Sequence, residues 1–106
     1  MPKRGEIALV KFPYTDFSGE KIRPALVIAH SVDHAVTLFI TSRATGRREW
    51  NIKIEASNSS GLAVDSMIRC DKIASFDLRI VQGTIGTASP SVMRAVDDKL
   101  RRLLKL

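Results

Sequence analysis

An arginine at the start of an apolar segment is the residue of this sequence best suited to phosphate chemistry. Arg23 precedes Pro24, and the apolar run Ala25 to Ala29 follows. Proline lacks a backbone N–H and biases the preceding residue toward extended geometry, and so short an apolar run is typical of a buried strand. We therefore expect Arg23 at the mouth of a strand, where its forked, charged donors match phosphate oxygens. The same position also suits an arginine that is solvated or paired with a carboxylate.

Charge and composition limit the kinds of partner. The chain has 106 residues, with 17 Lys and Arg against 11 Asp and Glu, which gives a net charge of +6. Such an excess raises the local concentration of a polyanion and makes its binding salt-dependent, but it is also an ordinary surface charge for a small domain. The hydrophobic fraction of 44% argues against disorder. The length predicts one domain over residues 1–106, with one shallow or shared site.

The cysteine and histidine content excludes several kinds of site. Cys70 is the only cysteine, so no intramolecular disulfide is expected and a reducing cytoplasm is favoured. With only His30 and His34 beside it, a structural zinc cluster lacks its ligands, and no metal site is expected. The N-terminal residues lack the apolar core of a signal peptide, and no apolar run approaches the roughly 20 residues that cross a bilayer, so no membrane partner is expected.

Alternating hydrophobicity predicts a series of short strands. They are expected from Ile7 to about Phe12, over Pro24 to Ala29, over Ala35 to Ile40, from Trp50 to Ile54, from Ser66 through Cys70 toward Ile73, and at Ile80 and Val81 before Gly83 and Gly86. The connections include a loop at 12–19, a turn at 30–34, a basic loop at 43–49 and a polar break at 57–61. Repeated short strands at this spacing predict a barrel or sandwich.

The C-terminal segment has a different period. Ser89 can cap a helix, and Pro90 suits its first position. The apolar residues that follow lie on one face at three-and-four spacing: Val92, Met93, Val96, Leu100, Leu103 and Leu104. We expect one amphipathic helix on the barrel. Its basic outer face is more typical of a solvated surface, favourable to the helix dipole, than of a contact with nucleic acid.

Four blocks of sequence occur in a characteristic order: Gly5 to Ile7, Phe12 to Gly19, Arg23 to Ile28 and Ile40 to Ser42. Together they resemble the MazF/PemK-type toxins of bacterial type II toxin–antitoxin systems, and later landmarks such as Asp71-Lys72-Ile73 extend the resemblance over essentially the whole chain. It implies a mostly β fold with a C-terminal helix, an SH3-like small barrel of the PemK/MazF/CcdB kind. It also implies a homodimer that cleaves single-stranded RNA sequence-specifically, without metal or cofactor, and that a cognate antitoxin neutralises.

The resemblance assigns roles to individual residues. Arg23 matches the arginine of the family's Arg-Pro motif, and Thr41 matches the threonine that ends the third strand, so these two are the catalytic candidates. Ile22 stands where some members have a histidine, so an acid–base histidine has no counterpart there. If the second and third strands are neighbours, the flanking residues expected to bind RNA are Tyr14, Lys21, Ser42, Arg43, Arg47, Arg48 and Lys72.

Some of these assignments have alternatives. Tyr14, Phe17 and Trp50 are the aromatic residues available for base stacking, but Phe17 and Trp50 also suit the core or a dimer interface. Lys72 either reaches a phosphate or pairs with Asp71. The two histidines are more typical of turn residues than of catalysts.

RNA carries its own nucleophile, because its 2′-hydroxyl can attack the adjacent phosphorus. Arg23 would stabilise the developing negative charge, an effect worth about 3 kcal/mol for a single donor, and Thr41 would hold the phosphate. The general acid and base are not identified. Two rival functions remain: a toxin of the same barrel that binds a protein target such as a topoisomerase, chiefly through its C-terminal helix, and an inactive paralogue that only binds antitoxin or RNA. The Arg-Pro motif and Thr41 favour the ribonuclease.

Overall fold

The computed structural model describes residues 2–12, 21–43 and 48–106. Within them the strands are β1 (Glu6–Phe12), β2 (Lys21–His30), β3 (His34–Thr41), β4 (Asn51–Ile54), β5 (Ser66–Asp77) and β6 (Val81–Thr87). The helix α1 (Pro90–Leu104) follows, and two short 3-10 helices, η1 (Arg48–Trp50) and η2 (Leu78–Ile80), precede β4 and β6. The strands form one antiparallel sheet in the order β4-β5-β3-β2-β1-β6, which confirms the predicted fold class.

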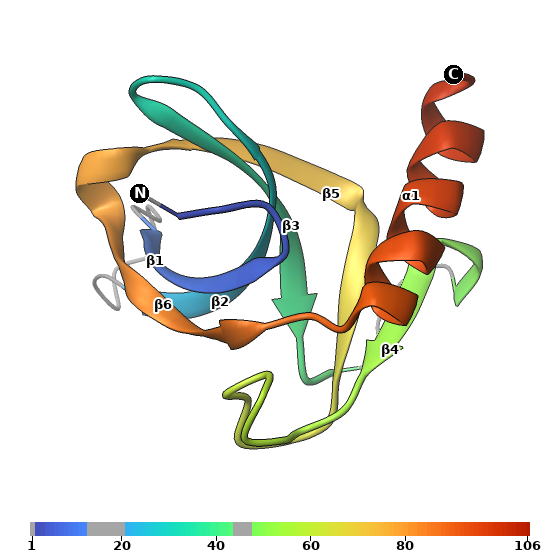
Figure 1. Ribbon diagram of the computed structural model, residues 1–106, viewed down its shortest axis with the longest axis horizontal. Coiled ribbons are helices and arrows are strands. Elements are labelled where there is room, and N and C mark those ends of the chain that lie inside the picture. The colour runs from blue at the N-terminus through green and yellow to red at the C-terminus, as the bar shows by residue number, and fades with distance from the viewer. Residues whose placement is uncertain (1, 13–20, 44–47) are drawn as a thin grey trace.

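The sheet curls into a small barrel-like shape because β5 bends (Figure 1). The first half of β5 pairs with β4 and with the end of β3, whereas its second half pairs with the start of β3. Between the halves the register moves from Phe39↔Arg69 to Leu38↔Ile73, so the residues from Cys70 to Lys72 form a bulge. A bulge of this kind increases the local bend and twist of a strand, which lets β5 serve both parts of the sheet.

The turn after β4 closes the gap toward β6. The backbone N–H of Thr87 donates to the carbonyl of Ser59 at 2.8 Å. Gly61 has a φ of +73°, and a Cβ there would lie 2.0 Å from the carbonyl oxygen of Ile85. At Gly86 a Cβ would lie 2.3 Å from the Ser59 carbonyl oxygen. Both positions therefore need glycine, and the polar break predicted at 57–61 is a turn that packs against the last strand.

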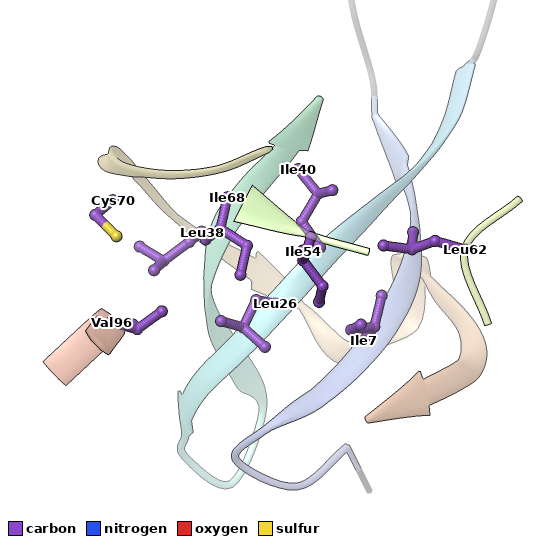
Figure 2. Close-up of a cluster of buried hydrophobic side chains, with 9 residues drawn as sticks. All are labelled: Ile7, Leu26, Leu38, Ile40, Ile54, Leu62, Ile68, Cys70 and Val96. Carbon is purple, nitrogen blue, oxygen red and sulfur yellow. The ribbon is translucent and has the colours of Figure 1, made fainter. Parts of the chain in front are cut away.

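The main core lies between the sheet and α1 (Figure 2). Leu26, Leu38 and Ile68 are fully buried there, and Val96 reaches them from the helix. The predicted cap is confirmed, because the Ser89 hydroxyl accepts a hydrogen bond from the N–H of Val92 at 3.2 Å. No helix in the described ranges is both long enough and apolar enough to cross a membrane.

The second strand begins earlier than predicted. It starts at Lys21, so Arg23 lies inside the strand, opposite Val10 of β1, rather than at its mouth. Pro24 is tolerated because the ladder between β2 and β3 begins only at Ala25, so β2 has an unpaired side at the proline.

Two further boundaries were wrong. Trp50 ends η1 instead of opening the fourth strand. Ile80 ends η2, and the last strand runs over Val81–Thr87, so Gly83 and Gly86 lie inside it rather than after it. The register between β1 and β6 shifts twice along this strand. Glycine inside a strand often marks such irregularities, which a simple alternation pattern does not reveal.

Candidate active site

The hairpin of β2 and β3 brings Arg23 and Thr41 to the same end of the sheet. The last hydrogen-bonded pairs between the strands are Leu26↔Leu38 and Ala25↔Phe39. Continued by two residues, this register places Arg23 across from Thr41. Residues that face each other in an antiparallel pair point to the same side of the sheet. A ligand lying across this end of the hairpin can therefore contact both side chains.

Arg23 keeps its donors available for such a ligand. Its side chain is exposed, and within the described residues it has no ion pair, whereas Arg4, Arg69 and Arg79 each pair with an aspartate. Lys21 lies two positions earlier on the same strand and is also exposed, so it adds positive charge on the same side. This end of β2 is suited to a phosphate.

Thr41 is held in a defined orientation at the end of β3. It is half-buried, and its hydroxyl oxygen accepts a hydrogen bond from the backbone N–H of Arg43 at 3.1 Å. A hydroxyl that accepts through its oxygen still has its own proton to donate. Ser42 and Arg43 follow and are exposed. The end of β3 thus offers hydroxyl groups and a guanidinium beside the Arg23 position.

Lys72 approaches the same face of the sheet from the bulge of β5. Its Nζ lies 5.6 Å from the centroid of the Phe39 ring, a cation–π contact, and that ring stacks on Phe76 with centroids 6.4 Å apart. Asp71 pairs instead with Arg69, with 3.3 Å between the carboxylate and Nη2. The alternative that Lys72 pairs with Asp71 is therefore wrong, and the ammonium stays on the side of the sheet that carries Phe39.

Several predicted RNA-binding residues fall outside the description. Tyr14, Phe17 and Arg47 lie in the ranges that the structure does not describe, as does the side chain of Arg48, which begins η1. Their roles stay predictions. Trp50 is half-buried at the end of η1. The Nζ of Lys99 in α1 donates to the carbonyl of Glu49, which anchors this turn to the helix.

The histidines lie at the opposite end of the hairpin. β2 ends at His30 and β3 begins at His34. His30 follows Arg23 by seven positions, which corresponds to roughly 23 Å along an extended strand. Nδ1 of His34 donates a hydrogen bond to the Asp33 carboxylate at 2.9 Å, and this bond raises the pKa of His34. Neither imidazole is therefore close enough to the site formed by Arg23 and Thr41 to transfer a proton there.

The sequence reasoning missed a line of side chains beside Thr41 that includes two polar residues. Phe39, Arg69 and Asn51 face one another across β3, β5 and β4, and we call these residues the outer row. The alternation of Asn51 and Lys53 with Ile52 and Ile54 could have shown that β4 has a polar side. What it could not show is which residue of β5 lies opposite. In the described part of the chain, no group of three His, Cys, Asp or Glu side chains could hold a metal ion.

The chain is similar to known proteins both in sequence and in structure. Residues 3–104 match the family described as PemK-like, MazF-like toxin of type II toxin–antitoxin system. MazF from Deinococcus radiodurans is 24% identical with a TM-score of 0.78, over 99% of this chain and 97% of that one. The toxin MazF-mt6 from Mycobacterium tuberculosis is 20% identical with a TM-score of 0.76, over 95% and 97%. An endoribonuclease in complex with its cognate antitoxin, from a mycobacterial species, is 15% identical with a TM-score of 0.79, over 100% and 97%. No curated protein matches the chain.

Because these solved structures are less than 25% identical to the chain, their similarity is evidence for the fold alone. This similarity shows that the chain shares its overall fold with them. The family match is stronger evidence because it spans all the strands and the helix to its last residue. On that evidence the chain belongs to the PemK-like, MazF-like toxins of type II toxin–antitoxin systems.

Proposed function

We propose that this toxin is an endoribonuclease that cleaves single-stranded RNA without a metal ion and that Arg23 and Thr41 are its catalytic residues. The observation that supports the proposal is the register of β2 and β3, which pairs Ala25 with Phe39 and, continued by two residues, sets Arg23 across from Thr41. A permanently charged fork of donors and a hydroxyl donor are the groups that can bind a phosphate whose negative charge increases during reaction.

The substrate supplies the nucleophile in this reaction. The 2′-oxygen attacks the adjacent phosphorus in line and loses its proton, the bond from phosphorus to the 5′-oxygen breaks, and the 5′-oxygen takes up a proton. The products are a 2′,3′-cyclic phosphate and a 5′-hydroxyl. Arg23 donates to the nonbridging oxygens as charge develops on them, and preorganised donors of this kind are worth about 100- to 1000-fold in rate. Thr41, oriented by the Arg43 N–H, donates a hydrogen bond to the same phosphate and keeps its proton.

Among the described residues, neither Arg23 nor a histidine is placed to take up the proton of the 2′-hydroxyl. Arginine stays protonated in proteins, so Arg23 acts as an electrostatic stabiliser rather than a base. His30 and His34, the only imidazoles of the sequence, lie at the far end of the hairpin. We therefore propose that water accepts the proton of the 2′-hydroxyl. A slow enzyme that depends on substrate binding is the expected consequence.

The cationic and hydroxyl side chains around Arg23 and Thr41 would bind the RNA chain. Lys21, Ser42, Arg43 and Lys72 are exposed in the structure, and Tyr14, Arg47 and Arg48 complete the proposed set. The net charge of +6 favours such a polyanion. The family, and relatives solved as complexes of MazE with MazF or of an endoribonuclease with its cognate antitoxin, support a cognate antitoxin as partner. We further propose that the toxin acts as a homodimer in the cytoplasm.

The test is to incubate the purified protein with a long mixed-sequence single-stranded RNA in excess EDTA and to analyse the fragment ends. Arg23→Ala, Thr41→Ala and the matched control Arg94→Ala, an exposed arginine of α1, are assayed beside it. We expect discrete fragments ending in 2′,3′-cyclic phosphate that disappear with Arg23→Ala and persist with Arg94→Ala. Intact RNA in the presence of folded wild-type protein would overturn the proposal and favour a toxin that acts by binding a protein.

A further inference from the structure

Three neighbouring strands present half-buried side chains on the side of the sheet that faces away from α1. The outer row consists of Phe39, Arg69 and Asn51, because Arg69 lies opposite Phe39 on one side and Asn51 on the other. A second line, one pleat further along, consists of Thr41, Met67 and Lys53. The residues between these lines are Ile40, Ile68 and Ile52, which belong to the main core or pack against it; Figure 2 shows Ile40 and Ile68 there. The outer row is therefore continuous with the end of β3 that carries Thr41.

The outer row contains two buried polar atoms without partners in the described residues. They are Nε of Arg69, a donor, and Oδ1 of Asn51, an acceptor. Since the two residues face each other across β4 and β5, the orphaned atoms belong to one small area. Buried polar groups are normally satisfied, so a donor and an acceptor left unpaired side by side call for an explanation. A ligand edge that offers an acceptor next to a donor would satisfy both.

The charges around the outer row favour an anionic ligand. Arg69 and Lys53 are cations of this face, and Lys72 is held above Phe39 at 5.6 Å from its ring centroid. The carboxylate beside them, Asp71, reaches Nη2 of Arg69 only at 3.3 Å, a long contact that a ligand can replace. Met67 provides an apolar floor between Thr41 and Lys53. Positive charge, an apolar surface and an adjacent donor and acceptor together fit a nucleotide of single-stranded RNA.

We propose that Arg69 and Asn51 form a base-recognition subsite for the nucleotide next to the phosphate bound by Arg23 and Thr41. Base entry draws Arg69 away from Asp71 and gives Nε and Oδ1 their missing partners on one base edge, while Lys72 contacts the neighbouring phosphate. Arg69 lies two positions along β5 from Met67, the residue opposite Thr41, which is about 7 Å in an extended strand. The role of this subsite in cleavage rests on the proposed ribonuclease function, but the binding of RNA to the subsite can be measured without cleavage.

The experiment selects short RNAs of random sequence that carry 2′-fluoro groups, which block cleavage, and sequences those bound by each variant. The variants are Asn51→Ala and the milder Arg69→Lys, with Asn58→Ala in the exposed turn as the matched control. Cleavage of unmodified RNA and thermal unfolding are measured on the same preparations. We expect wild-type protein and Asn58→Ala to select one base at one position about 10-fold over the others. Asn51→Ala and Arg69→Lys should lose the preference at that position and keep it elsewhere.

The outcomes separate the two proposals. Unchanged base preference in Asn51→Ala and Arg69→Lys, both folded, would overturn the subsite, and RNA cleavage by the same preparations would leave the ribonuclease standing. Loss of one base preference without any cleavage of unmodified RNA would support the subsite and overturn the ribonuclease. Failure of the wild-type protein to select any RNA would overturn the subsite as well.

Discussion

The two sides of β3, β4 and β5 differ in what covers them. On one side Leu38, Ile68 and Ile54 are buried under α1 (Figure 2). On the other side Thr41, Arg69 and Asn51 remain half-buried. Because side chains alternate along a strand, neighbouring residues of one strand belong to these different environments. Near the end of β3, the buried set of positions supports stability, and the adjacent set, Thr41, Arg69 and Asn51, is available for chemistry.

The largest expected effect on stability comes from the covered side. Leu38→Ala should lower the free energy of unfolding by about 2–5 kcal/mol, because it removes a fully buried side chain and leaves a cavity. Urea denaturation of Leu38→Ala and of Thr41→Val compares the free energies of unfolding of the two variants. If Thr41→Val cost as much as Leu38→Ala, the division between the two sides would be refuted.

The open side should show the reverse pattern. Thr41→Val keeps the shape of the side chain but removes the hydroxyl that accepts from the Arg43 N–H. We expect RNA cleavage to fall about 10- to 100-fold, as for the loss of a hydrogen bond to a charged group, while stability changes by less than about 1 kcal/mol. Thr41→Ser, which retains the hydroxyl, is the control. Full activity of Thr41→Val would exclude a direct contact with substrate.

A smaller effect is expected from the cap of the covering helix. Ser89→Ala removes the acceptor for the Val92 N–H and should cost about 1 kcal/mol of stability. Because α1 lies on the covered side, the rate of RNA cleavage at a temperature well below the unfolding midpoint should stay unchanged. Thermal unfolding and a cleavage assay on the same sample check both parts. A loss of activity without a loss of stability would contradict the assignment of α1 to stability alone.

The smallest effect concerns the far end of the β2–β3 hairpin. Hydrogen bonds from the Arg79 side chain and backbone N–H hold the pKa of Asp77 at about 2, below its ordinary 3.8. A lowered native pKa stabilises the fold above pH 3.8, and this contribution is lost as the pH falls toward 2. An NMR titration of the carboxyl groups should show the lowered pKa of Asp77, and Arg79→Ala should raise this pKa toward its ordinary value. An Asp77 that titrates normally in the wild-type protein would refute the contact.

The features that were predicted correctly depend on local sequence. The cap at Ser89 and the helix phase through Val96 follow from neighbouring residues alone. The start of β2 was missed because Lys21 and Ile22 are strand residues only through pairing with Phe12 and Lys11 of β1. The bulge of β5 was missed for the same reason, since Cys70 has the alternation of an ordinary strand.

The candidate site also depends on pairing between strands that are distant in the sequence. Arg23 and Thr41 were identified by resemblance to a family, and their facing positions depend on a register between two strands. The outer row depends on two further registers, those of β5 with β3 and with β4. No residue near Asn51 in the sequence indicates that Arg69 lies opposite. The catalytic roles of Arg23 and Thr41 stay predictions until they are measured.

In the proposed reaction Arg23 and Thr41 act on the same phosphate. The most direct measurement is a double-mutant cycle of single-turnover RNA cleavage with Arg23→Ala, Thr41→Val and the double variant. If both side chains contact one phosphate, the double variant should lose less than the product of the single losses, with a coupling of about 1 kcal/mol or more. Single losses that multiply without coupling, or an Arg23→Ala variant that cleaves at the wild-type rate, would contradict the account.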